Sequence, residues 1–110
     1  GRHAEHRAAE ALAAEGWDVL AQRVRTPLGE IDLVAQRAGL LAFVEVKARA
    51  NLTDAAFALG ASQRARLLRA GEWWLGANPG HGEAGVRFDV VLVDSEGRVR
   101  RIADAFRLGD

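Results

Sequence analysis

The 110-residue sequence contains no cysteine, which excludes a disulfide framework, a thiol nucleophile and any metal site with cysteine ligands. Its longest hydrophobic runs, such as residues 40–44, are far shorter than the roughly 20 residues that a membrane helix needs. No basic segment followed by an apolar one opens the chain, and the start at Gly1 predicts a trimmed terminus. We therefore expect a cytoplasmic protein with no membrane span.

The chain also lacks a net charge, because 15 basic residues balance 15 acidic ones. The charges are unevenly distributed, however. Residues 55–71 contain three arginines and no acidic residue, whereas residues 1–45 contain seven acidic residues. This distribution suits a cation site beside surfaces that hold phosphates, and the alternative is ordinary solvated charge on helix faces. With 49% hydrophobic and 27% charged residues, the length predicts one globular domain over residues 1–110.

Lysine is nearly absent, since 14 of the 15 basic residues are arginine and the remaining one is Lys47. Lys47 follows an apolar segment that reads as a buried strand. A lysine carries a compact charge that can contact a water or a phosphate as a point donor, and burial lowers its pKa readily. Its position therefore makes Lys47 a candidate for a specific chemical role.

Periodicity and turn residues predict two helices and five strands in the order α-β-β-β-α-β-β. In residues 3–15, Ala4, Ala8, Ala11 and Leu12 fall on one helical face. Gly39 lies in a link of hairpin length between the second and third strands. The predicted helices span 3–15 and 54–75, and the strands span 17–24, 30–36, 40–48, 86–93 and 98–103. The expected fold is α/β, with a mixed five-stranded sheet flanked by helices.

Charged side chains interrupt the apolar pattern of the central hairpin. Side chains alternate between the faces of a strand, so Glu30 and Asp32 share one face, and Glu45 shares a face with Lys47. A hairpin centred near residue 38 places Asp32 about opposite Glu45. Two neighbouring carboxylates repel each other unless a divalent cation lies between them.

This group of residues has the parts for metal-assisted phosphodiester hydrolysis. Mg²⁺ takes oxygen ligands, commonly one or two carboxylates with waters and phosphate oxygens. A lysine beside such an ion can orient the attacking water and stabilise charge on the phosphate. The alternative is a structural ion pair of Glu45 with Lys47 and a neighbouring Asp32, and spacing alone leaves both interpretations open.

The spacing of these residues resembles the core of the PD-(D/E)xK nucleases. Within that superfamily, three segments in order resemble the YraN-like bacterial family, which is related to archaeal Holliday-junction resolvases. They are Gly-Glu-Ile-Asp at 29–32, Phe-Val-Glu-Val-Lys-Ala-Arg at 43–49 and Arg-Phe-Asp-Val-Val at 87–91. The resemblance runs from residue 1 to about residue 106 and implies a restriction-endonuclease-like fold.

The resemblance also implies roles for particular residues. Asp32, Glu45 and the Val46 carbonyl would ligate Mg²⁺ or Mn²⁺, and Lys47 would be the catalytic lysine. Glu5 matches the helix glutamate that resolvase-like members add to the metal site and to catalysis. A homodimer is implied as well, since resolvase relatives act as dimers.

Two positions depart from the family pattern. Ile31, and not the proline of the PD motif, precedes Asp32, as in the YraN-like branch. Gln63 stands where the family often has a lysine, at the start of the basic stretch of the second helix.

The predicted function is that of a Mg²⁺- or Mn²⁺-dependent DNA endonuclease that acts on branched or junction DNA. The alternative is a non-catalytic DNA-binding or protein-interaction module that keeps the nuclease fold. Arginines would hold backbone phosphates without reading sequence. The candidates for these contacts are Arg23, Arg25, Arg49, Arg64, Arg66 and Arg69.

Two further pairs have structural interpretations. Asp89 faces the same way as Arg87, which favours an internal ion pair over a part in the site. Of Trp73 and Trp74, we expect one ring in the core and the other partly exposed.

Overall fold

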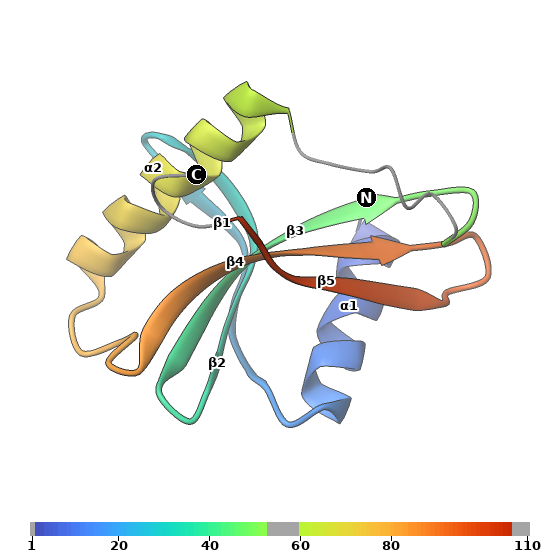
Figure 1. Cartoon of the computed structure of the whole chain (residues 1–110), viewed down its shortest axis with the longest axis horizontal. Coiled ribbons are helices and arrows are strands. Elements are labelled where there is room, and N and C mark those ends of the chain that lie inside the picture. Colours follow the sequence, from blue (N-terminus) through green and yellow to red (C-terminus); the bar gives the residue numbers. More distant parts are fainter. Residues whose placement is uncertain (1, 53–59, 107–110) are drawn as a thin grey trace.

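The computed structural model of the chain describes residues 2–52 and 60–106. The element order is the one that the sequence predicts, with two helices and five strands in these residues (Figure 1). The elements are α1 (Arg2–Ala14), β1 (Asp18–Thr26), β2 (Gly29–Arg37), β3 (Leu40–Ala48), α2 (Ala61–Ala77), β4 (Gly85–Val93) and β5 (Val99–Phe106). The prediction of an α/β fold with a mixed sheet is confirmed.

The five strands form one sheet in the order β1-β2-β3-β4-β5. Neighbouring strands are antiparallel except β3 and β4, which are parallel. Parallel neighbours require a crossover connection, and α2 lies within this one. Because helices cover both faces of the central strands, the middle of β3, from Leu41 to Glu45, is buried without a break.

The two helices pack on opposite faces of the sheet (Figure 1). The α1 face includes Ala42 and Val44 of β3, whereas the α2 face includes Leu41 and Phe43, as strand alternation requires. From the helices, Ala4, Ala8, Ala9 and Leu12 of α1 and Leu67, Ala70 and Trp74 of α2 complete the two cores. In the part of the chain that the structure describes, no helix has the length and apolarity to cross a membrane.

Gly71 explains how α2 comes so close to the sheet. A Cβ atom at this position would lie 2.9 Å from Phe43 Cδ2 and 3.2 Å from Phe88 Cε1. Trp74, one turn later, packs edge-on against Phe43 with ring centroids 5.9 Å apart. Trp74 is buried and Trp73 is 40% exposed, so the prediction for the tryptophan pair is confirmed.

The predicted helix 54–75 differs from α2 at its start. The structure begins the helix at Ala61 after an extended Gly60 (φ −64°, ψ 159°). The side-chain oxygen of Gln63 accepts a hydrogen bond from the Gly60 N–H at 3.1 Å, which closes the first turn. Residues 54–59 of the predicted helix lie outside the described residues. Gln63 therefore has a capping role at the position where the family often has a lysine.

The backbone conformation of the β2–β3 turn can be tested by substitution. Ala38 (φ 51°) and Gly39 (φ 79°) both have positive φ values between Arg37 and Leu40, as a type I′ turn requires. Alanine disfavours this region, whereas asparagine tolerates it. We expect Ala38→Asn to raise the free energy of unfolding by about 0.5–1 kcal/mol in chemical denaturation. Gly39→Ala should lower it, and equal effects of the two changes would contradict this turn assignment.

Candidate active site at the end of the β2–β3 hairpin

Asp32 lies where the pairing of β2 with β3 ends. The last registered pair is Leu33 with Val44, so continued pairing would bring Asp32 opposite Glu45, as the sequence predicts. Beyond that pair, Asp32 Oδ2 accepts a hydrogen bond from the Val46 backbone N–H at 2.8 Å. The carboxylate thus replaces a backbone acceptor in the sheet, which fixes its position beside β3.

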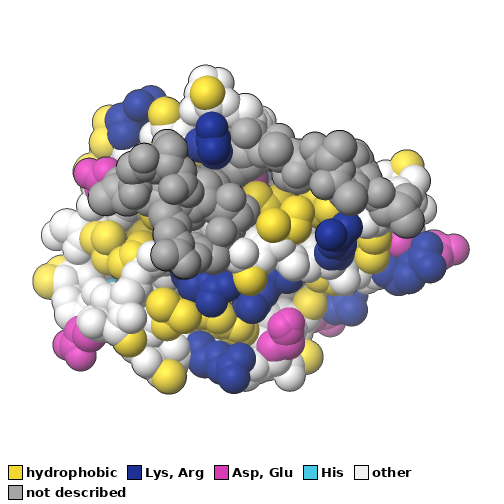
Figure 2. Space-filling view, in the orientation of Figure 1, with side chains coloured by type: hydrophobic (Ala, Val, Ile, Leu, Met, Phe, Trp, Pro, Cys, Tyr) yellow, Lys and Arg dark blue, Asp and Glu magenta, His cyan; other side chains and the backbone are white. Residues whose placement is uncertain are grey.

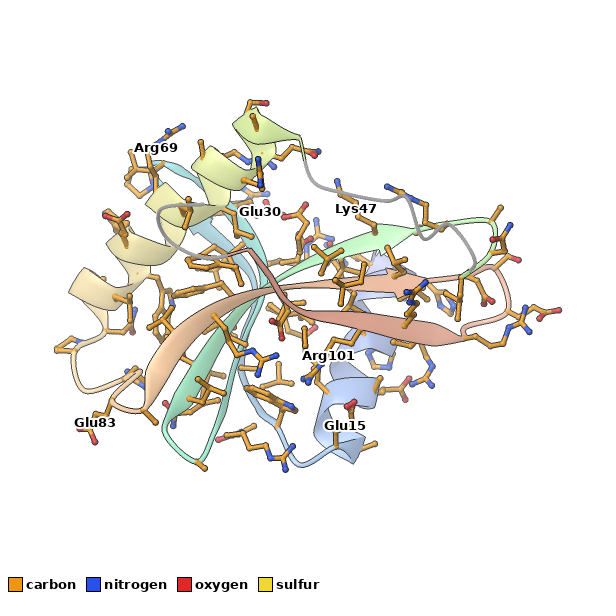
Figure 3. All side chains as sticks on the ribbon, in the orientation of Figure 1. Glu15, Glu30, Lys47, Arg69, Glu83 and Arg101 are labelled. Carbon is orange, nitrogen blue, oxygen red and sulfur yellow. The ribbon has the colours of Figure 1, made fainter. Side chains whose placement is uncertain are left out.

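Glu45 and Lys47 lie next to this carboxylate on β3. They follow Leu41 and Phe43 in the strand alternation and therefore face α2. The Glu45 side chain is 10% exposed and the Lys47 side chain 22%, and Lys47 Nζ lies 3.5 Å from Glu45 Oε1. Figure 3 shows Lys47 near the carboxyl end of β3. The ion pair of the structural interpretation is present, and it offsets part of the cost of burying Glu45.

The electrostatics show that several carboxylates converge on Asp32. The pKa of Asp32 is raised from the usual 3.8 to about 6, and burial is the largest cause. The negative charges of Glu45, Glu5 and Glu30 contribute to this rise, whereas the hydrogen bond from the Val46 N–H acts in the opposite direction. A carboxylate under repulsion from its neighbours is stabilised by a bound cation. This site therefore favours positive charge.

Glu5 reaches the site from α1 and is held by an arginine of β1. Its side chain is 12% exposed, and Arg23 Nη1 lies 3.3 Å from Glu5 Oε2. Arg23 has an unusual positive φ of 51°. It falls between the registered pairs Gln22–Leu33 and Val24–Ile31, which places it beside Asp32. From its sequence, Arg23 is predicted to contact DNA. Its contact with Glu5 was not predicted, because it depends on a positive φ at Arg23, which no sequence pattern indicates in a residue other than glycine.

The donor set limits which metal ions the site can take. In residues 2–52 and 60–106, no three His, Cys, Asp or Glu side chains are grouped so that they could hold one metal ion. Glu5 therefore does not form a three-carboxylate site with Asp32 and Glu45. Mg²⁺ commonly uses one or two carboxylates and keeps several waters, so Asp32 and Glu45 with a backbone carbonyl suit this ion. The oxygen donors fit a hard cation, and the chain has no cysteine or methionine to supply a sulfur ligand.

The six arginines proposed for DNA contact lie on β1, on α2 and directly after β3. Arg23 and Arg25 are exposed on β1, with Arg25 Nε 4.0 Å from Glu30 Oε2. Arg66 of α2 lies over the β1–β2 turn, where its Cγ would be 2.6 Å from a Cβ on Gly29. The α2 group is completed by Arg64 and Arg69, and Arg49 follows β3. In the view of Figure 2, basic side chains lie in separate groups between apolar and acidic ones.

Asp89 does not belong to this site. It is fully buried on β4, and Arg87 Nε lies 3.2 Å from its Oδ1, so the predicted internal ion pair is confirmed. The neighbouring Val90 packs on the α2 face of the sheet, so strand alternation places the Asp89 side chain on the α1 face. Arg101 also contacts Asp89, and the Trp17 ring packs against both arginines. Neither contact was predicted, since these residues are far apart in sequence.

Fold and site together define a mixed α/β protein with carboxylates and a lysine where two strands of its sheet separate. Residues 4–93 match the uncharacterised protein family UPF0102. The chain is 54% identical over 110 residues to a UPF0102 protein of Granulibacter bethesdensis, covering all of this chain and 70% of the relative. It is 51% identical over 106 residues to one of Bradyrhizobium sp. (strain ORS 278), covering 96% and 75%. The chain belongs to the UPF0102 family, which confirms the YraN-like resemblance.

Proposed function

We propose that this chain is a divalent-metal-dependent endonuclease that hydrolyses DNA phosphodiester bonds, including those of branched or junction DNA. The observation that carries the proposal is the position of Asp32, whose pKa is raised to about 6 beside Glu45. Perturbed carboxylates next to a lysine are typical of hydrolytic sites. The proposal includes membership of the PD-(D/E)xK superfamily, a restriction-endonuclease-like fold and action in the cytoplasm.

Three groups would hold the ion, which is Mg²⁺ or Mn²⁺. Asp32 and Glu45 would supply carboxylate oxygens and Val46 its backbone carbonyl. Glu5 would be an outer carboxylate that acts through the waters of the ion, and its contact with Arg23 keeps it near the site. The bound ion would lower the pKa of a water and neutralise charge on the phosphate. The bond from Val46 N–H leaves Asp32 one oxygen that no described backbone donor occupies.

Lys47 would act on the phosphate or on the attacking water. Its ammonium group lies 3.5 Å from Glu45, so the ligand and the donor are already adjacent. With Glu45 engaged by the ion, the three ammonium protons of Lys47 could be donated to a phosphate oxygen or a water. A charge placed in this way stabilises the extra negative charge of the transition state.

The experiment that tests the proposal is a cleavage panel. Junction, flap, duplex and single-stranded DNA are incubated with the protein in Mg²⁺ and in Mn²⁺, each with a chelator control. We expect metal-dependent products, most abundant on the branched substrates. A preparation that cleaves none of the four substrates with either metal would contradict the proposal.

The ion pairs at Glu45 and Glu5 favour one alternative, a DNA-binding or protein-interaction module without catalysis. In such a module Lys47 and Arg23 would neutralise carboxylates permanently. The two functions differ in their response to metal. The binding module should bind DNA equally well in chelator and should show no nicking with Mn²⁺.

The α2 arginines give a separate prediction about DNA contact. Arg64→Ala and Arg66→Ala should each weaken binding to all sequences alike and reduce the slope of log affinity against log salt by about one unit. Fluorescence anisotropy with two unrelated duplexes over a salt series measures both effects. Arg64→Lys and Arg66→Lys keep the charge and should keep the slope. Unchanged slopes in the alanine variants would assign these residues to a solvated helix face.

A further inference from the structure

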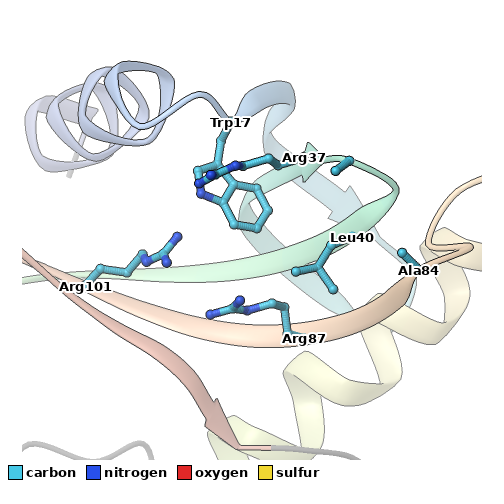
Figure 4. A pocket seen from close by; sticks show the side chains of 7 residues that line it. Trp17, Arg37, Leu40, Ala84, Arg87 and Arg101 are labelled. Atoms are coloured by element: carbon cyan, nitrogen blue, oxygen red, sulfur yellow. The ribbon is translucent and has the colours of Figure 1, made fainter.

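A cavity of about 430 Å³ opens at the other end of the β2–β3 hairpin, on the face of the sheet that α1 covers. Its wall combines aromatic, aliphatic and basic side chains (Figure 4). The lining residues are Trp17, Arg37, Ala38, Leu40, Ala84, Arg87 and Arg101. Cavities of this size hold small ligands, and apolar walls with a few convergent polar groups are typical of such sites.

Positive charge exceeds negative charge around this cavity. Arg37, Arg87 and Arg101 supply three guanidinium groups. The neighbouring Asp89 carboxylate, fully buried, contacts two of them, with Arg87 Nε at 3.2 Å and Arg101 Nη1 at 4.0 Å. In the described residues, no acidic side chain lies within ion-pair distance of Arg37. Among the described residues, one carboxylate therefore pairs with two of the three cations, and the third has no acidic partner.

Trp17 holds two of these guanidinium groups in place. The Cζ atoms of Arg87 and Arg101 lie 5.8 and 5.3 Å from the centre of its ring, which is within the range of cation–π attraction. Together with the contacts to Asp89, the ring orders both arginines before any ligand arrives. A preordered arginine loses less conformational entropy when it binds an anion.

Two nitrogen atoms of the cavity residues lie beneath the cavity surface. Trp17 Nε1 and Arg101 Nη1 are buried and have no hydrogen-bond partner among the described residues, and Arg101 Nη1 lies 4.0 Å from Asp89 Oδ2. The exposed parts of the three guanidinium groups are therefore what an anion in the cavity would contact.

We propose that this cavity binds a phosphate group. Three guanidinium groups suit a phosphate, which offers three or four oxygens, better than a carboxylate, which offers two. The volume beside Leu40 and Trp17 also leaves room for an organic group attached to the phosphate. Two sources present this chemistry, a free mononucleotide and the terminal phosphate of a nucleic acid strand.

The cavity is separate from the candidate active site and does not rest on the nuclease proposal. Arg37 is five residues from Asp32 along β2, which corresponds to about 16 Å at 3.3 Å per residue. Lys47 and Arg101 lie on opposite sides of the β4 ribbon in Figure 3. A phosphate in the cavity would therefore not be the one that the carboxylate site hydrolyses.

The test follows the indole N–H signal of Trp17 by NMR, assigned with a Trp17→Phe variant. The protein is titrated with inorganic phosphate, adenosine 5′-monophosphate, and a short single-stranded oligonucleotide with or without a 5′-phosphate. We expect saturable shifts with phosphate-bearing ligands and none with the unphosphorylated oligonucleotide. Tighter binding of the mononucleotide would identify a free ligand, and tighter binding of the phosphorylated oligonucleotide a strand end.

Arg37→Gln should weaken binding at least about tenfold, the loss expected for one charge-assisted contact. The variant should fold normally, because Arg37 is exposed at the turn. Arg100→Gln is the matched control, since Arg100 is an exposed neighbour of Arg101 on the other face of β5, and it should bind like wild type. The proposal is overturned if no ligand shifts the signal, or if Arg37→Gln or removal of the 5′-phosphate leaves affinity unchanged.

Discussion

Replacing Lys47 with alanine should reduce the rate of DNA cleavage at least about 100-fold while most of the DNA affinity remains. The ammonium group is the only lysine nitrogen in the chain, and it lies 3.5 Å from Glu45 Oε1. No other lysine can replace it at this position. DNA affinity should persist, because one lysine contributes little beside several arginines that contact phosphates.

The rate is measured under single-turnover conditions with Mg²⁺ and Mn²⁺ on the best substrate of the panel, and affinity by anisotropy in chelator. Lys47→Arg is the matched control for charge. It should also fail to cleave, since the larger planar guanidinium, which stays protonated, does not place a point donor at the same spot. Wild-type rates in either variant would remove Lys47 from catalysis.

Loss of cleavage must be separated from loss of the fold. Lys47→Ala leaves the Glu45 carboxylate, only 10% exposed, without its observed cation, so some destabilisation is expected. Mg²⁺ should restore the melting temperature of this variant if the ion occupies the same carboxylates, but it should not restore cleavage. That combination would show that metal binding and catalysis depend on different groups.

Strand alternation and turn signals were sufficient to predict the five strands and the mixed character of the sheet, but not the order of its strands. In β3, Leu41 and Phe43 face α2, whereas Ala42 and Val44 face α1. Because all four are apolar, the sequence alone predicts that both faces of this strand are buried. The bounds of β3 were predicted without error, because Gly39 marks its start. The exact start of α2 was less predictable. Gly60 begins the cap in an extended conformation, which the sequence does not distinguish from a helical glycine.

The carboxylate site was predictable to the extent that it depends on one hairpin. The register of Leu33 with Val44 follows from the turn, and it brings Asp32 and Glu45 together. The bond from Val46 N–H to Asp32 was not predictable, because it forms only where the backbone ladder ends. The Glu5–Arg23 contact depends on how α1 packs and on a positive φ in β1, and neither feature leaves a local pattern.

The phosphate cavity shows the same limit more clearly. Trp17 precedes β1, Arg37 ends β2, Arg87 lies in β4 and Arg101 in β5. Only the pair of Arg87 with Asp89 is local enough for strand alternation to reveal it. Packing of five strands in one order brings the other members together, so their joint role appears only in the folded chain.

Asp32→Asn should raise the free energy of unfolding of the metal-free protein by about 1 kcal/mol at pH 7–8, after allowance for partial solvent screening. Asn keeps an oxygen that can accept the Val46 N–H bond but removes the charge that Glu45 and Glu5 repel. The pKa of Asp32 is about 6 in the fold and 3.8 for the unperturbed side chain, so the folded state binds this proton more tightly. Ionisation of Asp32 therefore costs stability as pH rises from about 4 through 6. The advantage of the variant should vanish below about pH 4.

Denaturant unfolding of both proteins between pH 4 and 8 measures this difference. Asp94→Asn is a control of opposite sign. Burial acts to raise the pKa of Asp94, but the bonds from Arg98 and the Glu96 N–H outweigh it and lower the pKa. A lowered pKa stabilises the fold above the unfolded pKa, so Asp94→Asn should lose stability at neutral pH, with the loss shrinking as pH falls.

Added Mn²⁺ should reverse the order of wild type and Asp32→Asn. An ion that binds only the folded state stabilises it by RT ln(1 + [L]/Kd), about 2.7 kcal/mol at 100 times Kd. Wild type should gain this stability and the Asp32→Asn variant should lose most of it, because one of its two proposed carboxylate ligands is gone. Thermal melts in chelator and over a Mn²⁺ series give the comparison. If Asp32→Asn destabilises the metal-free protein and Mn²⁺ shifts neither melt, Asp32 is a structural acceptor for Val46 and the metal-dependent nuclease proposal fails.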